Sequence, residues 1–199
     1  IVKLEVPPGS VISEAEVSAT LGIGRTPVRE ALQRLETQAM LTRDGRSLIV
    51  ASLDHNQLAE LYAVRTELEG LAARLAARHA TDEEIRVLRG MVDDDLALLG
   101  ADPKLLSRAN KRFHKQIHLA SHNRFLVQQL DLVHRSMALM ANTSFAAEGR
   151  DEVALAEHDQ IVRAIENHDG EAAYQALKSH ISKAFETRLR VDAGELKTR

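Results

Sequence analysis

Residues 24–35, with the sequence Gly-Arg-Thr-Pro-Val-Arg-Glu-Ala-Leu-Gln-Arg-Leu, constrain the fold of this chain more than any other stretch. Thr26 is a good N-cap, and Pro27 suits the first position of a helix, where its missing N–H costs nothing. Apolar side chains then repeat at helical spacing at Val28, Leu32 and Leu35. This stretch therefore predicts an amphipathic helix with one buried face.

Arginines stand at the start of this predicted helix. Arg25 comes just before it, and Arg29 follows one turn later. Exposed N–H groups at a helix N-terminus, flanked by guanidinium groups, suit DNA phosphates and the guanine edges of a major groove. The same spacing also fits an ordinary amphipathic helix with solvated arginines, so the neighbouring segments must decide between the two interpretations.

Those segments predict a winged helix-turn-helix. A capping box at residues 13–16 opens an earlier helix, which Gly22 ends. The short connection between the two helices is typical of a helix-turn-helix. Residues 40–43 and 47–50 are expected to form two strands, joined by a tight turn at Gly45. The order helix, helix and hairpin is that of a winged domain.

At this point the sequence resembles the DNA-binding domain of bacterial GntR-type transcription regulators. Pro8-Gly9, the run Arg-Thr-Pro-Val-Arg-Glu-Ala-Leu at residues 25–32 and Arg34-Leu35-Glu36 carry the resemblance. It implies a homodimer that places two recognition helices in successive major grooves of double-stranded operator DNA. The residues expected to contact DNA are Arg25, Thr26, Arg29, Arg34, Gly45 and Arg46.

Composition excludes several other classes of protein. The absence of cysteine excludes disulfides and thiolate metal sites. No run of about 18 apolar residues and no signal-peptide pattern occurs, so we expect a cytoplasmic protein without a membrane partner. Net charge is −3, yet residues 24–46 carry five arginines against three acidic residues, a local excess of +2. Such a local basic patch favours specific docking on DNA. The first residues are interpreted as the end of a helix that begins upstream.

The rest of the chain predicts a second, all-helical domain. We expect a winged domain over residues 1–52, a helical domain over 53–190 and a disordered polar tail over 191–199. The predicted helices cover about 55–79, 81–99, 103–121, 123–142, 151–167 and 170–190. Capping residues stand at Thr81, Asp102 and Asp169. The predicted fold is mainly α, a winged helix-turn-helix followed by an antiparallel helical bundle.

Four polar residues of this bundle fall on apolar helix faces: Asn110, His114, His158 and His180. A buried polar group without a partner costs roughly 1–3 kcal/mol. Either each histidine is satisfied separately in the core, or the three converge on one metal ion such as zinc, for which imidazole is a good ligand. Spacing leaves both interpretations open. His118 and His122 share a face with two lysines and are expected to be solvated.

The bundle resembles the ligand-binding domain of the FadR-like subgroup of the same family. The matching motifs are Arg65-x-x-Leu68-Glu69, Asn110-x-x-Phe113-His114 and Glu157-His158 followed by His180. In metal-binding members an Asp or Asn and three histidines hold a divalent ion. The resemblance therefore implies a site at Asn110, His114, His158 and His180, with zinc favoured and nickel or manganese as alternatives. Four neutral ligands would keep the full +2 charge, which favours an anionic effector.

The sequence thus predicts a transcription regulator, not an enzyme, whose operator affinity is set by a small organic acid bound at the metal. Arg65, Arg135 and Arg163 are the candidate effector contacts, although Arg65 fits an ion pair with Glu69 at least as well. Two alternatives stay open. One is a metal-dependent hydrolase built on the bundle, which lacks a His-Glu-x-x-His motif. The other is a metal-free regulator whose histidines bind the effector directly.

Overall fold

The structure is a computed structural model that describes residues 6–137, 139–140 and 143–198. Its contacts divide the chain into two compact units, residues 1–58 with 132–141 and residues 59–131 with 142–199. The expected helix end at residues 1–5 lies outside the described part. Among the described helices, none is both long enough and apolar enough to cross a membrane.

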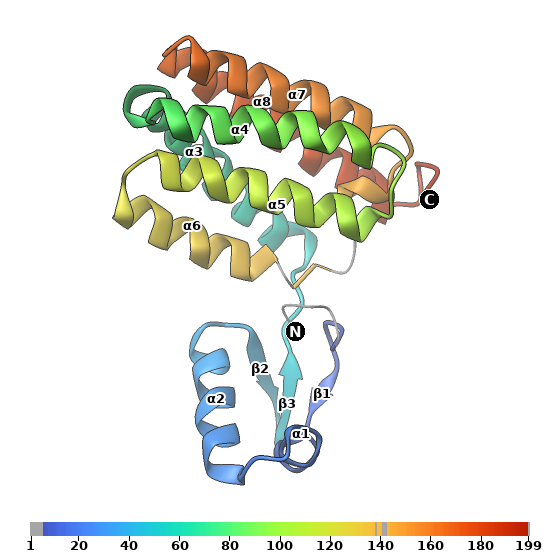
Figure 1. The fold of residues 1–199 in the computed structure, drawn as a ribbon. Helices are drawn as coiled ribbons and strands as arrows, with labels where there is room; N and C mark the ends of the chain where they lie inside the picture. The colour runs from blue at the N-terminus through green and yellow to red at the C-terminus, as the bar shows by residue number, and fades with distance from the viewer. Residues whose placement is uncertain (1–5, 138, 141–142, 199) are drawn as a thin grey trace. The chain divides into compact units, whose positions relative to one another are not determined.

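The N-terminal unit is a winged helix-turn-helix, as predicted (Figure 1). Its elements are β1 (Val11–Ile12), α1 (Glu14–Leu21), α2 (Arg25–Thr37), β2 (Leu41–Asp44) and β3 (Ser47–Val50). The strands form an antiparallel sheet in the order β1-β3-β2. Asp44 pairs with Ser47 across the turn, where Gly45 has a positive φ of 58°. β1 was not predicted, because two residues are too few to show strand alternation.

The buried face of α2 forms the core of this unit. Val28 and Leu32 are buried as expected, and they pack with Met40, Leu41 and Val50 from the hairpin. α1 contributes no buried residue and ends at Gly22, whose φ of 65° places it in the left-handed region. α2 is therefore held by its apolar stripe, which leaves its opposite face exposed.

The start of α2 differs from the prediction. The helix begins at Arg25, after Gly24, whose backbone is extended and supplies no side-chain cap. Thr26 is therefore not the N-cap, and Pro27 lies at the third helical position. Proline is tolerated there because the N–H groups of the first turn have no partner within the helix. Arg25 consequently lies on the first turn of the helix, not before it.

The six helices predicted after the winged domain are all present, and most of their residues belong to the second unit. They are α3 (His55–His79), α4 (Asp82–Asp95), α5 (Pro103–Ala120), α6 (Arg124–Met137), α7 (Arg150–Glu166) and α8 (Gly170–Asp192). Short 3-10 turns follow α4, at Leu96–Leu98, and precede α7, at Ser144–Ala146. α7 packs on α8, and α4 lies between α7 and α5 (Figure 1). The result is a helical bundle.

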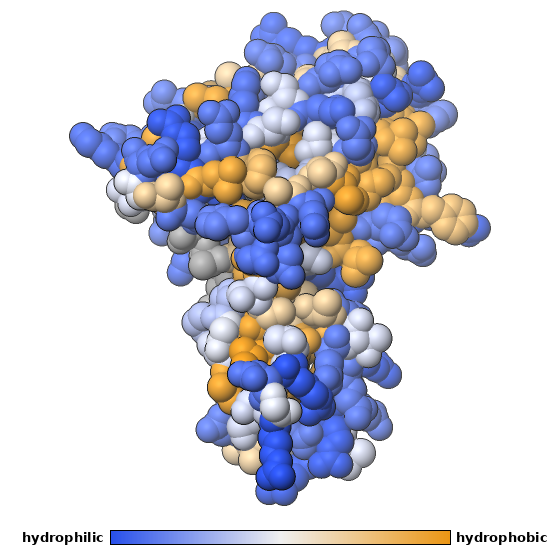
Figure 2. Space-filling model, turned by 180° about the vertical axis from the view of Figure 1, so that it is seen from behind, coloured by the Kyte–Doolittle hydropathy of each residue, from blue (hydrophilic) through white to orange (hydrophobic). Residues whose placement is uncertain are grey.

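Small and branched apolar residues fill the centre of this bundle. α3 lines it with four fully buried alanines, which allow its neighbours to approach closely. The larger core residues are Leu88 of α4, Phe113 and Ile117 of α5, Ile161 and Ile165 of α7, and Leu177 of α8. Outside the core, Figure 2 shows hydrophobic residues standing among hydrophilic ones on one face of the molecule.

Helix caps in the second unit follow the sequence prediction closely. Thr81 and Glu84 form a reciprocal capping box, and Asp102 accepts a hydrogen bond at the start of α5. Asp169 accepts one from the N–H of Ala172. The tail does not fit the expectation of disorder, because α8 continues to Asp192 and Thr198 forms an antiparallel bridge with Ala147.

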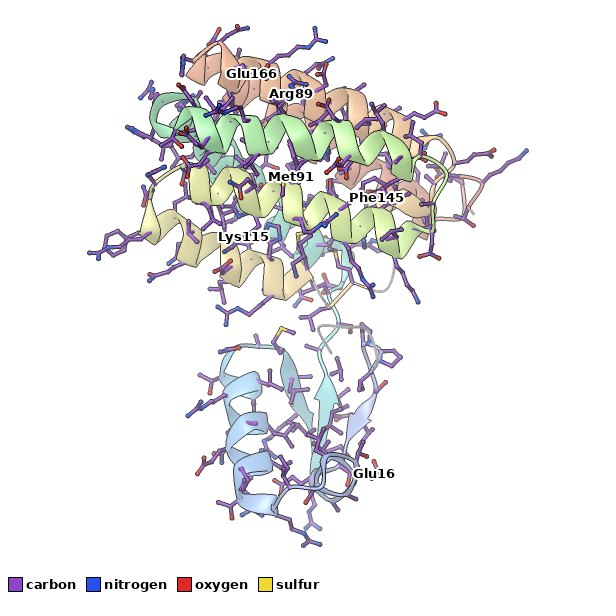
Figure 3. All side chains as sticks on the ribbon, in the orientation of Figure 1. Glu16, Arg89, Met91, Lys115, Phe145 and Glu166 are labelled. Carbon is purple, nitrogen blue, oxygen red and sulfur yellow. The ribbon has the colours of Figure 1, made fainter. Side chains whose placement is uncertain are left out.

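One arginine ties α4 to α7 at the surface of the bundle. Arg89 donates to Asp159 at 2.6 Å and to Glu166 at 2.7 Å, and Figure 3 shows Arg89 and Glu166 facing each other from the two helices. The Glu166 hydrogen bond is the main reason why the pKa of Arg89 lies above its usual value. Such partly exposed pairs add little stability, but they fix how two helices align.

Candidate metal centre and nucleic-acid interface

The exposed face of α2 carries the arginines that the sequence assigned to DNA. Arg25, Arg29 and Arg34 are all exposed, as is Thr26. The guanidinium of Arg29 donates from Nη2 to the carboxylate of Glu14 on α1 at 3.1 Å. This pair orients Arg29 across the helix-turn-helix, so its side chain is held at the surface where a DNA backbone or base could replace the carboxylate.

The wing presents a second exposed basic position. Gly45 and Arg46 lie in the turn between β2 and β3, and both are exposed. The neighbouring Arg43 donates two hydrogen bonds to Glu36 at the end of α2. Arg43 therefore fastens the wing to the recognition helix, whereas Arg46 stands at the tip of the hairpin.

Three buried histidines meet in the helical unit. His114 of α5, His158 of α7 and His180 of α8 are each no more than 3% exposed. Their ring nitrogens lie within 4.8 Å of one another, and Nε2 of His114 is 3.2 Å from Nε2 of His180. Helix spacing left this convergence open and the family resemblance implied it; the structure brings all three side chains together.

Orphaned acceptor atoms show that this cluster fits a metal ion. In the described part of the chain, Nε2 of His158 and Oδ1 of Asn110 are buried and have no hydrogen-bond partner. Both residues line the same small cavity of about 20 Å³. Imidazole nitrogens together with an amide oxygen make a donor set that zinc and similar divalent ions accept. The residues present therefore fit the ion that the resemblance implied.

The protonation state of the cluster also suits metal binding. Burial lowers the pKa of His158 and His180 well below the usual value, and the neighbouring histidines lower both further. Burial likewise lowers the pKa of His114. Neutral imidazoles keep a lone pair on one ring nitrogen, and a metal requires this lone pair.

Glu69 on α3 accepts hydrogen bonds from two histidines of α5. Its Oε2 accepts from Nδ1 of His114 at 2.7 Å and from Nε2 of His118 at 2.9 Å. Burial opposes the charged form of Glu69, but these two histidines outweigh it, so the pKa of Glu69 lies well below its usual range. A proton fixed on Nδ1 leaves Nε2 of His114 as the free electron-pair donor that faces His180.

This arrangement corrects the prediction for His118. The side chain is 1% exposed and bonded to Glu69, so it is not solvated. His118 lies four residues after His114, which is the spacing of neighbours on one helix face. His118 also lies three residues after Lys115, on the face that carries the lysines, so the sequence pattern fitted both a buried and a solvated histidine. His122, in contrast, is half exposed and pairs with Glu84, as expected for a solvated residue.

The candidate effector arginines lie in different environments. Arg65 is buried and donates from Nε to Oε1 of Glu69 at 3.2 Å, which is the ion pair that the sequence also allowed. Arg163 is exposed and pairs with Asp159 of its own helix. Arg135 is exposed on α6. The structure therefore places Arg65 beside the histidine cluster and brings neither of the other two to it.

Sequence reasoning gave no role at the site to two further groups, although Glu157 belongs to a motif that carries the resemblance. Glu157 accepts from Nδ1 of His180 at 2.8 Å, which mirrors the role of Glu69 toward His114. Arg150, 5% exposed, donates from Nη2 to the same carboxylate oxygen at 2.8 Å. In the sequence, both residues look like ordinary solvated charges of a helix. The one available signal was that Arg150, at the start of α7, precedes an apolar stripe.

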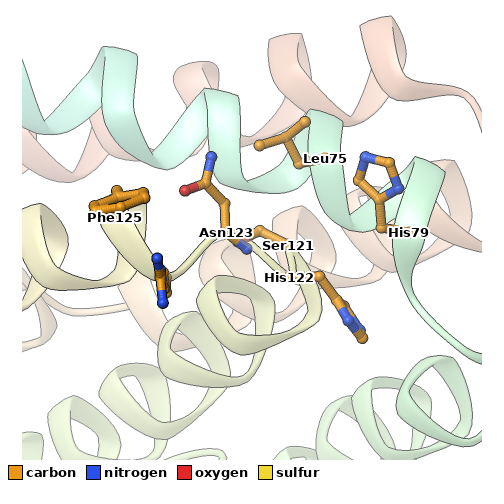
Figure 4. Close-up of a pocket in the computed structure, with 7 residues that line it drawn as sticks. Leu75, His79, Ser121, His122, Asn123 and Phe125 are labelled. Atoms are coloured by element: carbon orange, nitrogen blue, oxygen red, sulfur yellow. The ribbon is translucent and has the colours of Figure 1, made fainter.

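A cavity of about 590 Å³ lies elsewhere in this unit, at the turn between α5 and α6. Figure 4 shows the residues that line it: Leu75, His79, Ser121, His122, Asn123, Arg124 and Phe125. It includes none of the three clustered histidines. Among the described residues, none that lines this cavity has a buried polar atom without a hydrogen-bond partner. The cavity therefore lacks the unsatisfied donor atoms that mark the histidine cluster as a candidate metal site.

Comparisons with known proteins agree with both units. Residues 1–50 match the family described as bacterial regulatory proteins, gntR family, and residues 60–183 match the FCD domain. The regulator YdhC of Bacillus subtilis is 29% identical over 88% of this chain and 80% of its own. A Paenarthrobacter nicotinovorans protein named "Probable D-xylose utilization operon transcriptional repressor" is 31% identical over 89% of this chain and 78% of its own.

A solved structure shows the same fold. Escherichia coli McbR/YncC superposes with a TM-score of 0.80 and 20% identity, covering 94% of this chain and 90% of that one. The matched families and relatives are transcription regulators and not enzymes, so the hydrolase alternative is not retained. With an N-terminal winged helix-turn-helix and a helical unit in which three histidines meet, this chain belongs to the GntR family of bacterial regulatory proteins and carries an FCD domain.

Proposed function

We propose that this protein is a homodimeric, metal-dependent regulator of the FadR-like subgroup whose affinity for operator DNA responds to a small organic acid. The single observation that carries the proposal is the buried cluster of three histidines beside the orphaned Oδ1 of Asn110. The resemblance implies a metal ion in this domain, and the cluster supplies a matching set of neutral donors.

In this proposal the ion is held by Asn110, His114, His158 and His180. Zinc suits three imidazoles best, and nickel or manganese are the alternatives. Because all four donors are neutral, the bound ion keeps its +2 charge in a water-poor interior. A carboxylate of the effector can offset that charge, and Arg65, which is bonded to Glu69, is the candidate effector arginine that could also contact it. An effector bound there would favour one arrangement of the dimer over another.

Metal analysis tests the centre directly. Protein purified without chelator is expected to contain about one divalent ion per chain, and His114→Ala, His158→Ala and His180→Ala should each lower this content sharply. His122→Ala is the matched control, because it also removes a histidine that donates to a carboxylate but lies at the surface. Unchanged metal content in all three core variants would refute the centre.

DNA recognition is proposed to use α2 and the wing of each protomer, acting on operators in the cytoplasm. Support comes from the exposed residues Arg25, Thr26, Arg29, Arg34, Gly45 and Arg46. Two copies related by a two-fold axis can read a near-palindromic site. The exposed apolar side chains Leu119, Phe125 and Leu132 are available for burial in such a dimer.

Binding to an operator selected from random DNA tests this interface. Arg25→Ala and Arg29→Ala should each weaken specific binding at least roughly fivefold, because a bidentate arginine–guanine contact is lost. The thermal midpoint and the sedimentation of the dimer should stay close to those of the wild type, since both side chains are exposed. Wild-type affinity in both variants would contradict the proposed docking.

A further inference from the structure

A second cavity of the helical unit is lined by two cations that contact Glu157, Arg150 and Lys183. It has a volume of about 430 Å³ and opens to solvent between the start of α7 and the last turns of α8. Its lining includes three cationic side chains, Arg150, Lys183 and Arg190, and two acidic ones, Glu148 and Glu186. None of these residues took part in the proposed metal centre.

Arg150 is the unusual member of this lining. Its side chain is 4% exposed, yet within the described residues its Nε and Nη1 donate to no acceptor. Burying a guanidinium of which only one nitrogen has a hydrogen-bond partner costs folding free energy. Such unsatisfied donors are rare in native proteins and call for an explanation. An anion that approached through the cavity would satisfy the remaining donors with charge-assisted hydrogen bonds.

The surroundings of Arg150 favour a carboxylate that also carries hydroxyl groups. Lys183 is half exposed on the neighbouring helix and adds a second cation at the same carboxylate, Glu157. Gly149 leaves the start of α7 without a side-chain cap, while Asp151 and Glu152 in the first turn offset part of the positive potential of the helix end. Glu148 and Glu186 would repel a polyanion, but each can accept a hydrogen bond from a hydroxyl group of the ligand.

Glu157 connects this cavity to the histidine cluster. Its Oε2 accepts from Nη2 of Arg150 and from Nδ1 of His180, both at 2.8 Å, and Lys183 lies 3.2 Å from Oε1. An anion that drew Arg150 and Lys183 toward itself would leave Glu157 with His180 as its main partner. A stronger bond to Nδ1 makes Nε2 of His180 a better metal ligand.

We propose that this cavity binds a small hydroxylated carboxylate through Arg150 and Lys183, and that Glu157 couples its occupancy to metal binding at His180. The coupling rests on the metal centre proposed above, whereas the cavity site does not. Because coupling between two sites is reciprocal, the ligand should raise metal affinity by the same factor by which the metal raises ligand affinity.

Calorimetric titration of the full chain with D-gluconate tests the cavity. Hexanoate, of the same length without hydroxyl groups, and inorganic phosphate are the comparison probes, and both should bind at least tenfold more weakly. Lys183→Gln should weaken gluconate binding about tenfold, and Arg150→Gln at least as much. Arg86→Gln, which removes an exposed, ion-paired arginine outside the cavity, should leave it unchanged. Circular dichroism shows whether each variant folds. If Arg150→Gln does not fold, Lys183→Gln still tests the site, because the Lys183 side chain is exposed.

Equal gluconate affinity in the wild type and in Lys183→Gln, or no gluconate binding by the wild type, would overturn the site. Competition with a zinc chelator, with and without gluconate, tests the coupling, and several-fold tighter zinc binding is expected when gluconate is present. Unchanged zinc affinity would overturn the coupling through Glu157. A protein that binds gluconate but no zinc would refute the metal centre and leave the cavity site standing.

Discussion

Replacing Glu69 by glutamine should weaken metal binding without touching any proposed metal ligand. The carboxylate is fully buried and accepts three hydrogen bonds, from His114, His118 and Arg65. An amide of the same shape accepts less strongly and has no charge, so it holds the Nδ1 proton of His114 less firmly. Loss of such a supporting carboxylate typically costs 10–100-fold in metal affinity, or roughly 1.4–2.7 kcal/mol.

The same substitution also leaves Arg65 without its charged partner in the core. Breaking a buried ion pair from one side costs roughly 3–5 kcal/mol of stability. For a chain of this size that corresponds to a fall in Tm of about 6–20 °C. The double variant Arg65→Met with Glu69→Gln should recover much of the Tm, because it removes the uncompensated charge, but its metal affinity should stay low.

Zinc affinity is measured by competition with a fluorescent chelator, and Tm by scanning calorimetry of the metal-free protein. Glu84→Gln is the matched control, because Glu84 also accepts from a histidine, His122, at 2.9 Å, but at the surface. It should leave zinc affinity within twofold. Zinc affinity in Glu69→Gln that equals the wild-type value would show that His114 needs no support from Glu69, and the reasoning would fail.

Three further outcomes are expected. Asn110→Asp should tighten metal binding, because a carboxylate is a stronger ligand than an amide, and chelator competition measures this. It also lowers the site charge from about +2 to about +1, so an operator-binding titration at fixed metal loading should show a weaker effect of an anionic effector. Arg46→Ala should weaken binding to specific and random DNA by similar factors in a filter-binding assay, as expected for a backbone contact. Thr81→Ala should lower Tm by about 2–4 °C, since a lost N-cap costs about 1 kcal/mol.

The sequence predicted most of the fold because helical periodicity and caps are local signals. The bounds of α3 agree with the prediction, and the capping residues Thr81, Asp102 and Asp169 all act as expected. The strand β1 and the ordered tail escaped prediction for a different reason. Both are short segments whose structure depends on pairing with distant residues, Ile49 for β1 and Ala147 for the tail.

The candidate site was predicted in part for the same reason. His114, His158 and His180 each interrupt an apolar stripe, which is visible in the sequence, and the structure confirms that they meet. Glu69 was expected as the partner of Arg65 in a buried ion pair, and the structure agrees. Glu157 is an acidic residue on a long helix, where exposure is the usual expectation. Its contact with His180 follows from which helices pack together, and no spacing rule within one helix contains that information.

The pairing of the chain end with the segment before α7 has a practical consequence. The N–H of Glu148 donates to the carbonyl of Lys197, and Thr198 forms a bridge with Ala147, so the last described residues brace the turn that leads into Arg150. Cleavage of the chain just before Lys197 would therefore loosen the Arg150 side of Glu157 while leaving the helices whole. The rate at which an added protease cuts there becomes a reporter of what occupies the neighbouring cavity.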